Sequence, residues 1–215
     1  DGIQALDHVS FDAYGGEILG IAGISGSGQK ELLEAIAGLR AAQPGSHVIY
    51  HPPSPHEPIA GQHVPVDRGG EELLGKNPRQ IHDIGVSMAF VPEDRLGMGL
   101  VGSMGMADNM MLKTYRSGRG PLLNRKPPRA LAEKVKQELD VLTPSINTPV
   151  RRLSGGNVQK VLVGREIAQE PSVLMTAYAV RGLDINTSYT IYNLLTEEKK
   201  KGVAVIFVGE DLDVL

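Results

Sequence analysis

The hydrophobic and polar positions of the chain follow two periods, one typical of strands and one typical of helices. Short apolar runs predict buried strands at residues 18–22, 86–91, 173–177 and 203–208, with a further short strand at 48–50. Val9, Phe11 and Ala13 alternate with polar residues, which predicts a half-buried strand, antiparallel to its neighbour.

Apolar residues three or four positions apart predict helices between these strands. The residues that carry this spacing are Leu32, Leu33, Ile36 and Leu39, then Val158, Val161, Leu162 and Ile167, and finally Ile191, Leu194 and Leu195. Because strands alternate with helices, we expect an α/β fold with a mainly parallel sheet covered on both faces.

The middle of the chain has a different pattern. Residues 106–116 and 129–142 predict two helices, separated by a Gly/Pro/basic linker at 117–128. Asn77-Pro78 predicts the start of a short helix that Gly85 ends. Residues 51–68 are rich in Pro, His and Gly and predict an exposed loop.

Composition narrows the class of protein. The chain has 215 residues, 41% of them hydrophobic, a formal net charge of −3 and no cysteine, so we expect no disulfide and no thiolate metal site. The charge gives no reason to expect a nucleic-acid partner. No apolar run approaches the roughly 20 residues of a membrane span. No signal peptide is visible, so we expect a cytoplasmic domain. The chain begins without methionine, which indicates a fragment of a longer protein.

A glycine loop follows the predicted strand at 18–22 and precedes a predicted helix, which is the context of a phosphate-binding loop. In the pattern G-x-x-x-x-G-K-[ST], Gly23 and Gly28 are in place, but Gln29 holds the lysine position and Lys30 the Ser/Thr position. The backbone cradle is therefore kept, while the charge and the metal ligand are not. The alternative is a glycine turn that binds nothing. The candidate nucleotide-binding residues are Gly23, Ser25, Gly26, Ser27, Gly28, Gln29, Lys30 and Glu31.

A second candidate anion site is LSGGNVQK at residues 153–160. Gly155 and Gly156 free the backbone to present N–H groups, and Asn157 is predicted to cap the helix that follows. Ser154, bare amides and a helix N-terminus together predict anion binding. The alternative is an ordinary Gly-Gly turn before a helix.

Five segments in this order resemble the ATP-binding domain of ABC transporters. They are the glycine loop, VPEDR at 91–95, LSGGN at 153–157, RGLD at 181–184 and GED at 209–211. The chain is most similar to the second, C-terminal ATP-binding domain of bacterial sugar and nucleoside importers. The resemblance implies a P-loop NTPase (RecA-like) core at residues 1–105 and 151–215, an antiparallel β part near 1–20 and 46–68, and an inserted helical lobe at 106–150.

The resemblance also implies that this chain's own nucleotide site is degenerate. The family's magnesium-binding aspartate and its catalytic glutamate are matched by Ala177 and Tyr178, its glutamine by Glu93 and its switch histidine by Glu210. Loss of a general base alone costs about 10²–10⁴-fold in rate. We therefore expect weak ATP binding, no support for Mg²⁺ at this site, and an isolated domain that is inactive or nearly so.

In this family two domains sandwich two nucleotides head to tail. The resemblance thus implies that Ser154, Gly155, Gly156 and Asp184 complete a hydrolytic site, with its Mg²⁺, on a partner domain. The implied partners are a second ATP-binding domain, the N-terminal half of the same polypeptide, and transmembrane permease subunits that contact residues 93–111. The implied location is peripheral, at the cytoplasmic face of the inner membrane, and the implied cargo is a nucleoside or a monosaccharide.

Two alternatives stay open at this point. One is a soluble ABC-type ATPase acting on ribosomes or nucleic acid, which the acidic charge and VPEDR disfavour. The other is an interaction module that no longer binds nucleotide. No metal site is predicted, because the spacing of His47, His51, His56 and His63 matches no metal-binding pattern.

Overall fold

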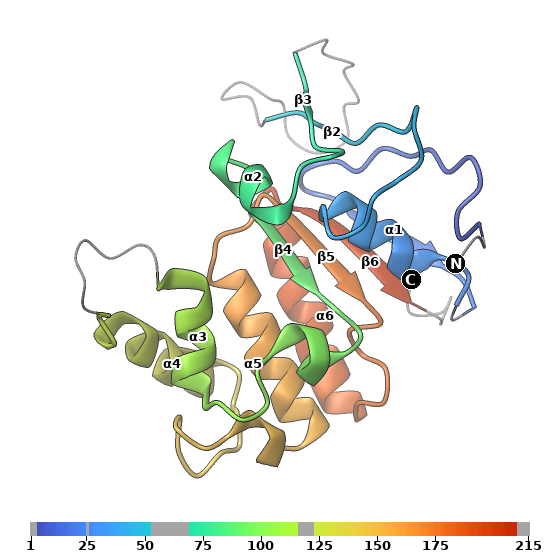
Figure 1. Cartoon of the computed structure of the whole chain (residues 1–215). Helices are drawn as coiled ribbons and strands as arrows, with labels where there is room; N and C mark the ends of the chain where they lie inside the picture. The colour runs from blue at the N-terminus through green and yellow to red at the C-terminus, as the bar shows by residue number, and fades with distance from the viewer. Residues whose placement is uncertain (1–3, 25, 53–68, 116–122, 210–215) are drawn as a thin grey trace. The chain divides into compact units, whose positions relative to one another are not determined.

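The computed structural model describes residues 4–24, 26–52, 69–115 and 123–209 of the chain (Figure 1). The chain falls into two compact units, each formed by segments that are distant in sequence. The first unit comprises residues 1–90, 170–178 and 195–215, and the second comprises residues 91–169 and 179–194. The predicted division into a core and a lobe at 106–150 stays a prediction.

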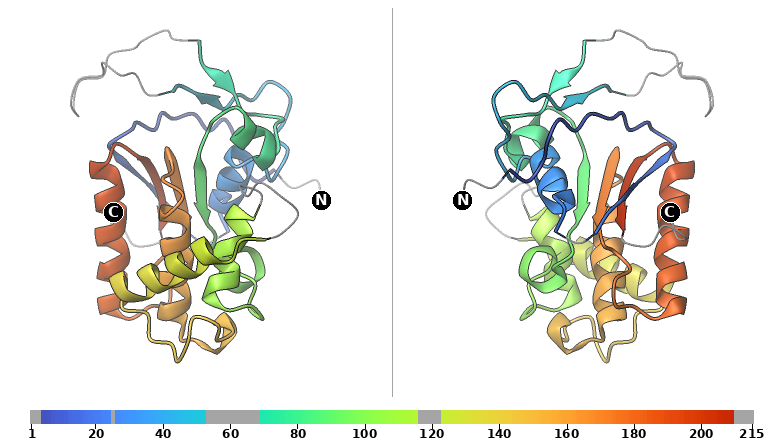
Figure 2. Two further views of the ribbon diagram at one scale, coloured as in Figure 1. Left: turned by 90° about the vertical axis from the view of Figure 1, so that its left-hand side faces the viewer. Right: turned by 90° about the vertical axis from the view of Figure 1, so that its right-hand side faces the viewer.

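A parallel sheet organises the first unit. Its strands lie in the order β1 (Ile18–Ala22), β6 (Ala204–Gly209), β5 (Val173–Ala177) and β4 (Met88–Val91). Strand β6 pairs in parallel with both neighbours, with Val205 opposite Ile18 of β1 and opposite Leu174 of β5. Helix α1 (Gln29–Ile36) contacts β5 and lies beside the sheet, as the two views of Figure 2 show. The predicted α/β class and mainly parallel sheet are confirmed.

Burial within this sheet follows strand position. Every residue of β6 is buried because the strand has a neighbour on each side. Leu33 of α1 packs with Met175 of β5 and Ile206 of β6 in one hydrophobic core. Strand β1 lies at the edge, where Ile18 is 38% exposed. The strand predicted at 18–22 is therefore confirmed, but its predicted burial is wrong.

The first unit also holds a small antiparallel sheet of β2 (Ile49–Tyr50) and β3 (Glu71–Glu72). The short helix α2 (Pro78–Asp83) confirms the helix predicted after Asn77. Asn77 Oδ1 accepts from the Gln80 amide at 3.0 Å, and Gln80 Oε1 accepts from the Asn77 amide at 2.9 Å. This reciprocal pair satisfies amides that have no acceptor within the helix.

The strand predicted from Val9, Phe11 and Ala13 is wrong. Residues 9–13 form no strand, and Val9 is 51% exposed. No described strand pairs with this segment, so no sheet among the described residues covers its alternating apolar side chains. The antiparallel part expected near 1–20 is thus limited, in the described residues, to β2 and β3. Of the loop predicted at 51–68, residues 53–68 lie outside the described residues.

The second unit is helical. It contains the π-helical turn η1 (Arg95–Gly99), α3 (Met106–Thr114), α4 (Lys126–Glu138), the 3₁₀ turn η2 (Val150–Arg152), α5 (Gly155–Ile167) and the first part of α6 (Ile185–Lys200). Helix α5 contacts α3, α4 and η1. The approach of α4 and α5 requires a small residue at Gly164, because a Cβ there would lie 2.6 Å from Val135 Cγ1.

The boundaries of the middle helices differ from the prediction. Helix α4 begins at Lys126 rather than at residue 129, with Pro127 and Pro128 in its first turn. Proline fits there because first-turn amides have no acceptor within the helix. The helix ends at Glu138, and Leu142, expected on its apolar face, is 70% exposed.

A buried charged cluster joins three segments of the second unit. The Glu166 side chain is fully buried on α5 and accepts from Lys113 Nζ of α3 at 2.9 Å. Arg165 Nη2 donates to Glu166 Oε1 at 2.7 Å and to the Gly99 carbonyl of η1 at 2.7 Å. Because each buried charge is paired, the cluster avoids the penalty of an isolated buried ion.

Candidate functional site

The glycine loop of the first unit depends on left-handed glycines. Gly26 has φ 89° and Gly28 has φ 92°, and α1 begins directly after Gly28. A Cβ at Gly28 would lie 2.2 Å from the Ala5 carbonyl oxygen, so only glycine fits. The loop therefore has the predicted strand–loop–helix context. Ser25, one of the predicted binding residues, lies outside the described residues.

Gln29, at the lysine position, fills the inside of this loop. Its side chain is buried, and its Nε2 donates to the Ile24 carbonyl at 3.3 Å. A Cβ at Gly23 would lie 2.0 Å from that Nε2, so the amide group is folded over Gly23. Gln29 Oε1 is buried without a hydrogen-bond partner in the described part of the chain. The neutral amide thus stands where the phosphate-binding pattern has a cation.

Lys30 does not replace that cation within the loop. Its Nζ lies 3.8 Å from Glu34 Oε1, one turn along α1. Ser27 closes the loop through its amide, which donates to the Ile24 carbonyl at 3.1 Å. The carboxylate of Glu31, in the first turn of α1, adds no positive charge.

The end of β5 offers no carboxylate. Ala177 and Tyr178 are both buried in the hydrophobic core of the first unit, and Tyr178 has φ 50°. The Tyr178 amide donates to the Val208 carbonyl at 3.0 Å. Oxygen ligands are what Mg²⁺ requires, and a methyl group and a core phenol ring do not fit it. No group of three or more His, Asp or Glu residues within the described ranges could hold a metal ion.

The LSGGN segment of the second unit forms the start of α5. Ser154 caps this helix: its Oγ accepts from the Asn157 amide at 3.4 Å and from Asn157 Nδ2 at 2.8 Å. The prediction that Asn157 is the cap is wrong, because Ser154 is extended and already reaches the first-turn amides. Asn157 Oδ1 instead accepts from the Leu142 amide at 2.9 Å.

Gly155 and Gly156 occupy the first turn of α5, where amides have no acceptor within the helix. A Cβ at Gly156 would lie 3.0 Å from Thr187 Oγ1 and 3.5 Å from Asp184 Oδ2. The second unit therefore brings Ser154, Gly155 and Gly156 beside Asp184, although about thirty positions separate them in sequence. We call these four residues the signature half-site. Its amides and hydroxyl suit a phosphate group.

Asp184 is fixed at the start of α6. Its Oδ2 accepts from Thr187 Oγ1 at 2.7 Å, and its Oδ1 accepts from the Thr187 amide at 2.9 Å. The hydrogen bond from the Thr187 side chain is the main cause that lowers the pKa of Asp184. The carboxylate is therefore ionised at neutral pH.

Arg95 lies beside the signature half-site and was missed as a site residue in the sequence. Its Nε donates to Gln159 Oε1 at 2.7 Å, and its Nη2 donates to the Arg181 carbonyl at 2.5 Å. A Cβ at Gly155 would lie 3.5 Å from Arg95 Nη1. Burial lowers the pKa of Arg95, and the charge of Glu93 opposes that shift. The VPEDR motif marks this arginine in the sequence but not its contacts.

Glu93, matched to the family's glutamine, is engaged within the second unit. Its Oε1 accepts from Arg181 Nη1 at 2.6 Å, which ties VPEDR to the RGLD turn. Glu210 lies outside the described residues. The structure thus places Glu93 beside the RGLD turn, which precedes Asp184.

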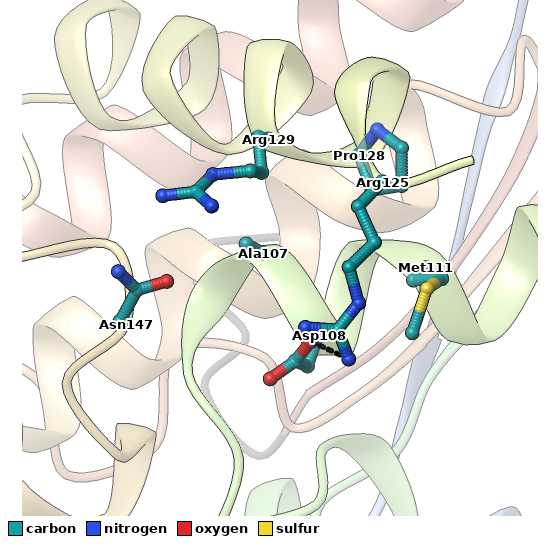
Figure 3. Close-up of a pocket in the computed structure, with 7 residues that line it drawn as sticks. All are labelled: Ala107, Asp108, Met111, Arg125, Pro128, Arg129 and Asn147. Carbon is teal, nitrogen blue, oxygen red and sulfur yellow. Dashed lines mark ion pairs between the residues drawn. The ribbon is translucent and has the colours of Figure 1, made fainter. Parts of the chain in front are cut away.

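A small pocket lies between α3 and α4 of the second unit, and none of the predicted binding or catalytic residues lines it. Figure 3 shows Arg125 reaching from the start of α4 to Asp108 of α3, an ion pair of 3.6 Å. The pocket is lined by Ala107, Asp108, Met111, Arg125, Pro128, Arg129 and Asn147. None of the helices in the described segments is both long and apolar enough to cross a membrane.

Comparison with known proteins gives a family match across most of the chain. The family model described as "ABC transporter" matches residues 6–176. A glucose import ATP-binding protein of Haloferax volcanii is 36% identical over 217 residues, covering 99% of this chain and 36% of the relative. A guanosine import ATP-binding protein of Bacillus subtilis is 32% identical, covering 99% of this chain and 38% of the relative.

Solved structures agree on the fold. A dimeric bacterial ABC transporter cassette, MJ0796, has a TM-score of 0.73 at 23% identity, covering 98% of this chain and 82% of that one. Its post-hydrolysis form with ADP and Pi has a TM-score of 0.75 at 22% identity, with the same coverage. The chain spans less than two fifths of the length of the two import proteins it resembles.

Proposed function

The chain belongs to the ABC transporter family, and from this premise we propose that it is an ATP-binding cassette of an importer for monosaccharides or nucleosides. The relatives named for glucose, guanosine and xylose import support this cargo class. Because those relatives are far longer than this chain, transport belongs to a larger assembly.

Within that assembly this cassette's own phosphate loop is a degenerate site. Gln29 places a neutral amide in the loop, and Ala177 and Tyr178 offer neither a metal ligand nor a base. Loss of one charge-assisted hydrogen bond alone costs about 1.5–3 kcal/mol of binding. The site binds ATP weakly, through backbone amides from Gly23 to Gly28, and does not hydrolyse it.

The signature half-site acts on a nucleotide held by another cassette. The observation that carries this proposal is the contrast between the two regions. The loop lacks a cation, a metal ligand and a base, whereas the start of α5 has first-turn amides with no acceptor within the helix, a capping serine and the nearby carboxylate of Asp184. Ser154, Gly155 and Gly156 would contact the phosphates of ATP bound with Mg²⁺ on the partner. That nucleotide's lysine, metal ligand and base would come from the partner.

The remaining assignments follow from family membership. The partner cassette is the N-terminal half of the same polypeptide, and the pair works with permease subunits at the cytoplasmic face of the inner membrane. Residues 93–111 lie in the segment proposed to contact the permease. The core at 1–105 and 151–215 and the lobe at 106–150 are the proposed domains.

ATP hydrolysis by this chain alone, and by the chain mixed with its partner cassette, tests the proposal. We expect no turnover from the chain alone and turnover from the mixture. Ser154→Arg should abolish it, because a long cation would fill the anion position. Gln29→Ala should change it less than about threefold, since that loop contributes no chemistry. Arg152→Gln, next to the motif but exposed, is the matched control. Turnover by the chain alone at the rate of the mixture would refute the degenerate site.

A further inference from the structure

Arg95 joins segments that are far apart in the chain but meet at the signature half-site. Its Nε reaches Gln159 on α5, and its Nη2 reaches the carbonyl of Arg181 in the RGLD turn. These bonds use two donor nitrogens of one planar guanidinium group. Since a guanidinium is rigid, the two acceptors are held at a fixed separation.

The bond to Gln159 is strongly determined. Gln159 is fully buried, one turn after Gly155 and Gly156, and its Nε2 has no hydrogen-bond partner among the described residues. Its Oε1 is the acceptor that Arg95 satisfies. A buried polar group with only part of its bonds made is costly, so a packing role alone would favour an apolar side chain here.

A second contact links the RGLD turn to the VPEDR segment. The Arg181 side chain pairs with Glu93, two residues before Arg95, at 2.6 Å. The turn then leads into Asp184, whose Oδ2 lies near Gly156. Two residues of VPEDR therefore bind Arg181, three residues before Asp184. Arg95 binds its backbone carbonyl, and Glu93 binds its side chain.

We propose that Arg95, together with Gln159, is a positioning residue of the signature half-site: it fixes the RGLD turn against the first turn of α5. Asp184 and the amides of Gly155 and Gly156 then face a partner's nucleotide in one arrangement. This inference rests on the proposed action of the half-site in trans. In this arrangement the VPEDR segment sets the geometry of the half-site through Arg95, which does not itself contact the nucleotide.

Two variants test this in the assembled pair of cassettes. Arg95→Lys keeps the charge but offers its donors from a single nitrogen, so it cannot reproduce the planar spacing of Nε and Nη2 that reaches Gln159 and the Arg181 carbonyl. Gln159→Met keeps the volume but removes the oxygen that accepts from Arg95 Nε. We expect each to lower kcat for ATP hydrolysis by about 10- to 100-fold, the effect of a small misplacement of catalytic groups. KM for ATP should change little, because the partner's own loop supplies most of the affinity. Arg152→Gln should leave both constants unchanged.

The Tm of the variants distinguishes a positioning role of these residues from a role in folding. Gln159→Met removes a half-satisfied buried amide but also leaves Arg95 Nε–H without its acceptor, so the two effects oppose each other and the Tm of the chain should fall by no more than about 4 °C. A loss of kcat with no larger loss of Tm, shared by both variants, supports the inference. The double variant should lose no more than the worse single one, because both break the same bond.

The outcomes also separate this inference from the function on which it rests. If Ser154→Arg abolishes turnover while Arg95→Lys and Gln159→Met keep the full kcat, the positioning role is wrong and the in-trans role stands. If Ser154→Arg has no effect, the in-trans role itself fails. A fall of kcat together with a fall of Tm of more than about 4 °C in Gln159→Met would also overturn the inference, by making the residue a structural one.

Discussion

Single residues decide what the phosphate loop can do. Gly26 and Gly28 have the left-handed conformation, which is compatible with the backbone shape of an anion-binding loop. The side chains inside it do not match that shape: Gln29 donates to the Ile24 carbonyl rather than offering a charge. The glycines at residues 23–28 therefore do not by themselves indicate which side-chain chemistry the loop holds.

Gln29→Lys tests this separation of shape from chemistry. The lysine should strengthen ATP binding by about 10- to 150-fold, since a charge-assisted hydrogen bond contributes roughly 1.5–3 kcal/mol. It should restore no hydrolysis, because Ala177 and Tyr178 still supply neither metal ligand nor base. Fluorescent-nucleotide titration and phosphate release measure the two effects.

The matched control is Gln43→Lys, which adds the same charge at an exposed position of the same unit. It should leave ATP affinity within about twofold, because long-range surface charge is screened. Hydrolysis by Gln29→Lys alone would show that a metal site and base exist elsewhere in the chain.

At the scale of elements, the sequence predicts a helix or a strand correctly where the contacts of that segment in the fold agree with its local hydrophobic pattern. β5 spans the predicted residues 173–177, and α2 follows the predicted Asn-Pro start. The strand prediction fails where a segment has no neighbouring strand to pair with. Residues 9–13 alternate like a strand but have no described strand beside them. The start of α4 was missed because its prolines indicated a linker, although a first turn accepts them.

The residues of the candidate site also fall into two groups, those that the sequence predicts and those that it does not. Ser154 and Asp184 could be found from motifs, because each lies in a short segment with a characteristic order along the chain. Arg95 and Gln159 could not, since 64 positions separate them and only folding brings them to 2.7 Å. The cap was assigned to Asn157 because it is a good capping residue, but the extended Ser154 backbone gives that role to the earlier serine.

Strands β2 and β3 supply a pH-dependent prediction. Glu72 Oε1 accepts from the amides of Val48 and Leu74, each at 2.9 Å. The Val48 bond is the main cause that lowers the pKa of Glu72 from 4.5 to about 2. Because the folded pKa lies below the ordinary value, the stabilisation is complete above pH 4.5 and is lost as the pH falls toward 2.

Amide hydrogen exchange at Val48 and Leu74 can follow this loss, after correction for the intrinsic pH dependence of exchange. Protection should fall between pH 4.5 and 2 in the unchanged chain. Glu72→Gln should flatten that profile, whereas Glu71→Gln, on the same strand, should keep it. Equal profiles for the unchanged chain and Glu72→Gln would mean that the carboxylate does not hold this small sheet.

For the whole molecule, charge bears on which partners are possible. The chain carries 22 basic and 25 acidic residues, and several of its arginines and lysines are paired with carboxylates in the described segments, among them Lys113 with Glu166 and Arg125 with Asp108. Binding to nucleic acid draws mainly on basic side chains that neutralise phosphates. One local concentration of positive charge is at the start of α4, where Arg125, Lys126 and Arg129 lie close together in sequence.

Binding to duplex DNA and to structured RNA therefore tests the alternative of an ABC-type ATPase acting on nucleic acid. At about 0.15 M salt we expect a Kd weaker than about 10⁻⁴ M, the weak end of nonspecific binding. Any binding at low salt should weaken in the double variant Arg125→Gln/Arg129→Gln, because it removes two exposed cations at the start of α4. A Kd below about 10⁻⁶ M at 0.15 M salt, with a steep loss as salt rises, would instead favour a nucleic-acid partner over a permease. The signature half-site would then still act in trans, but in a machine that moves no cargo across a membrane.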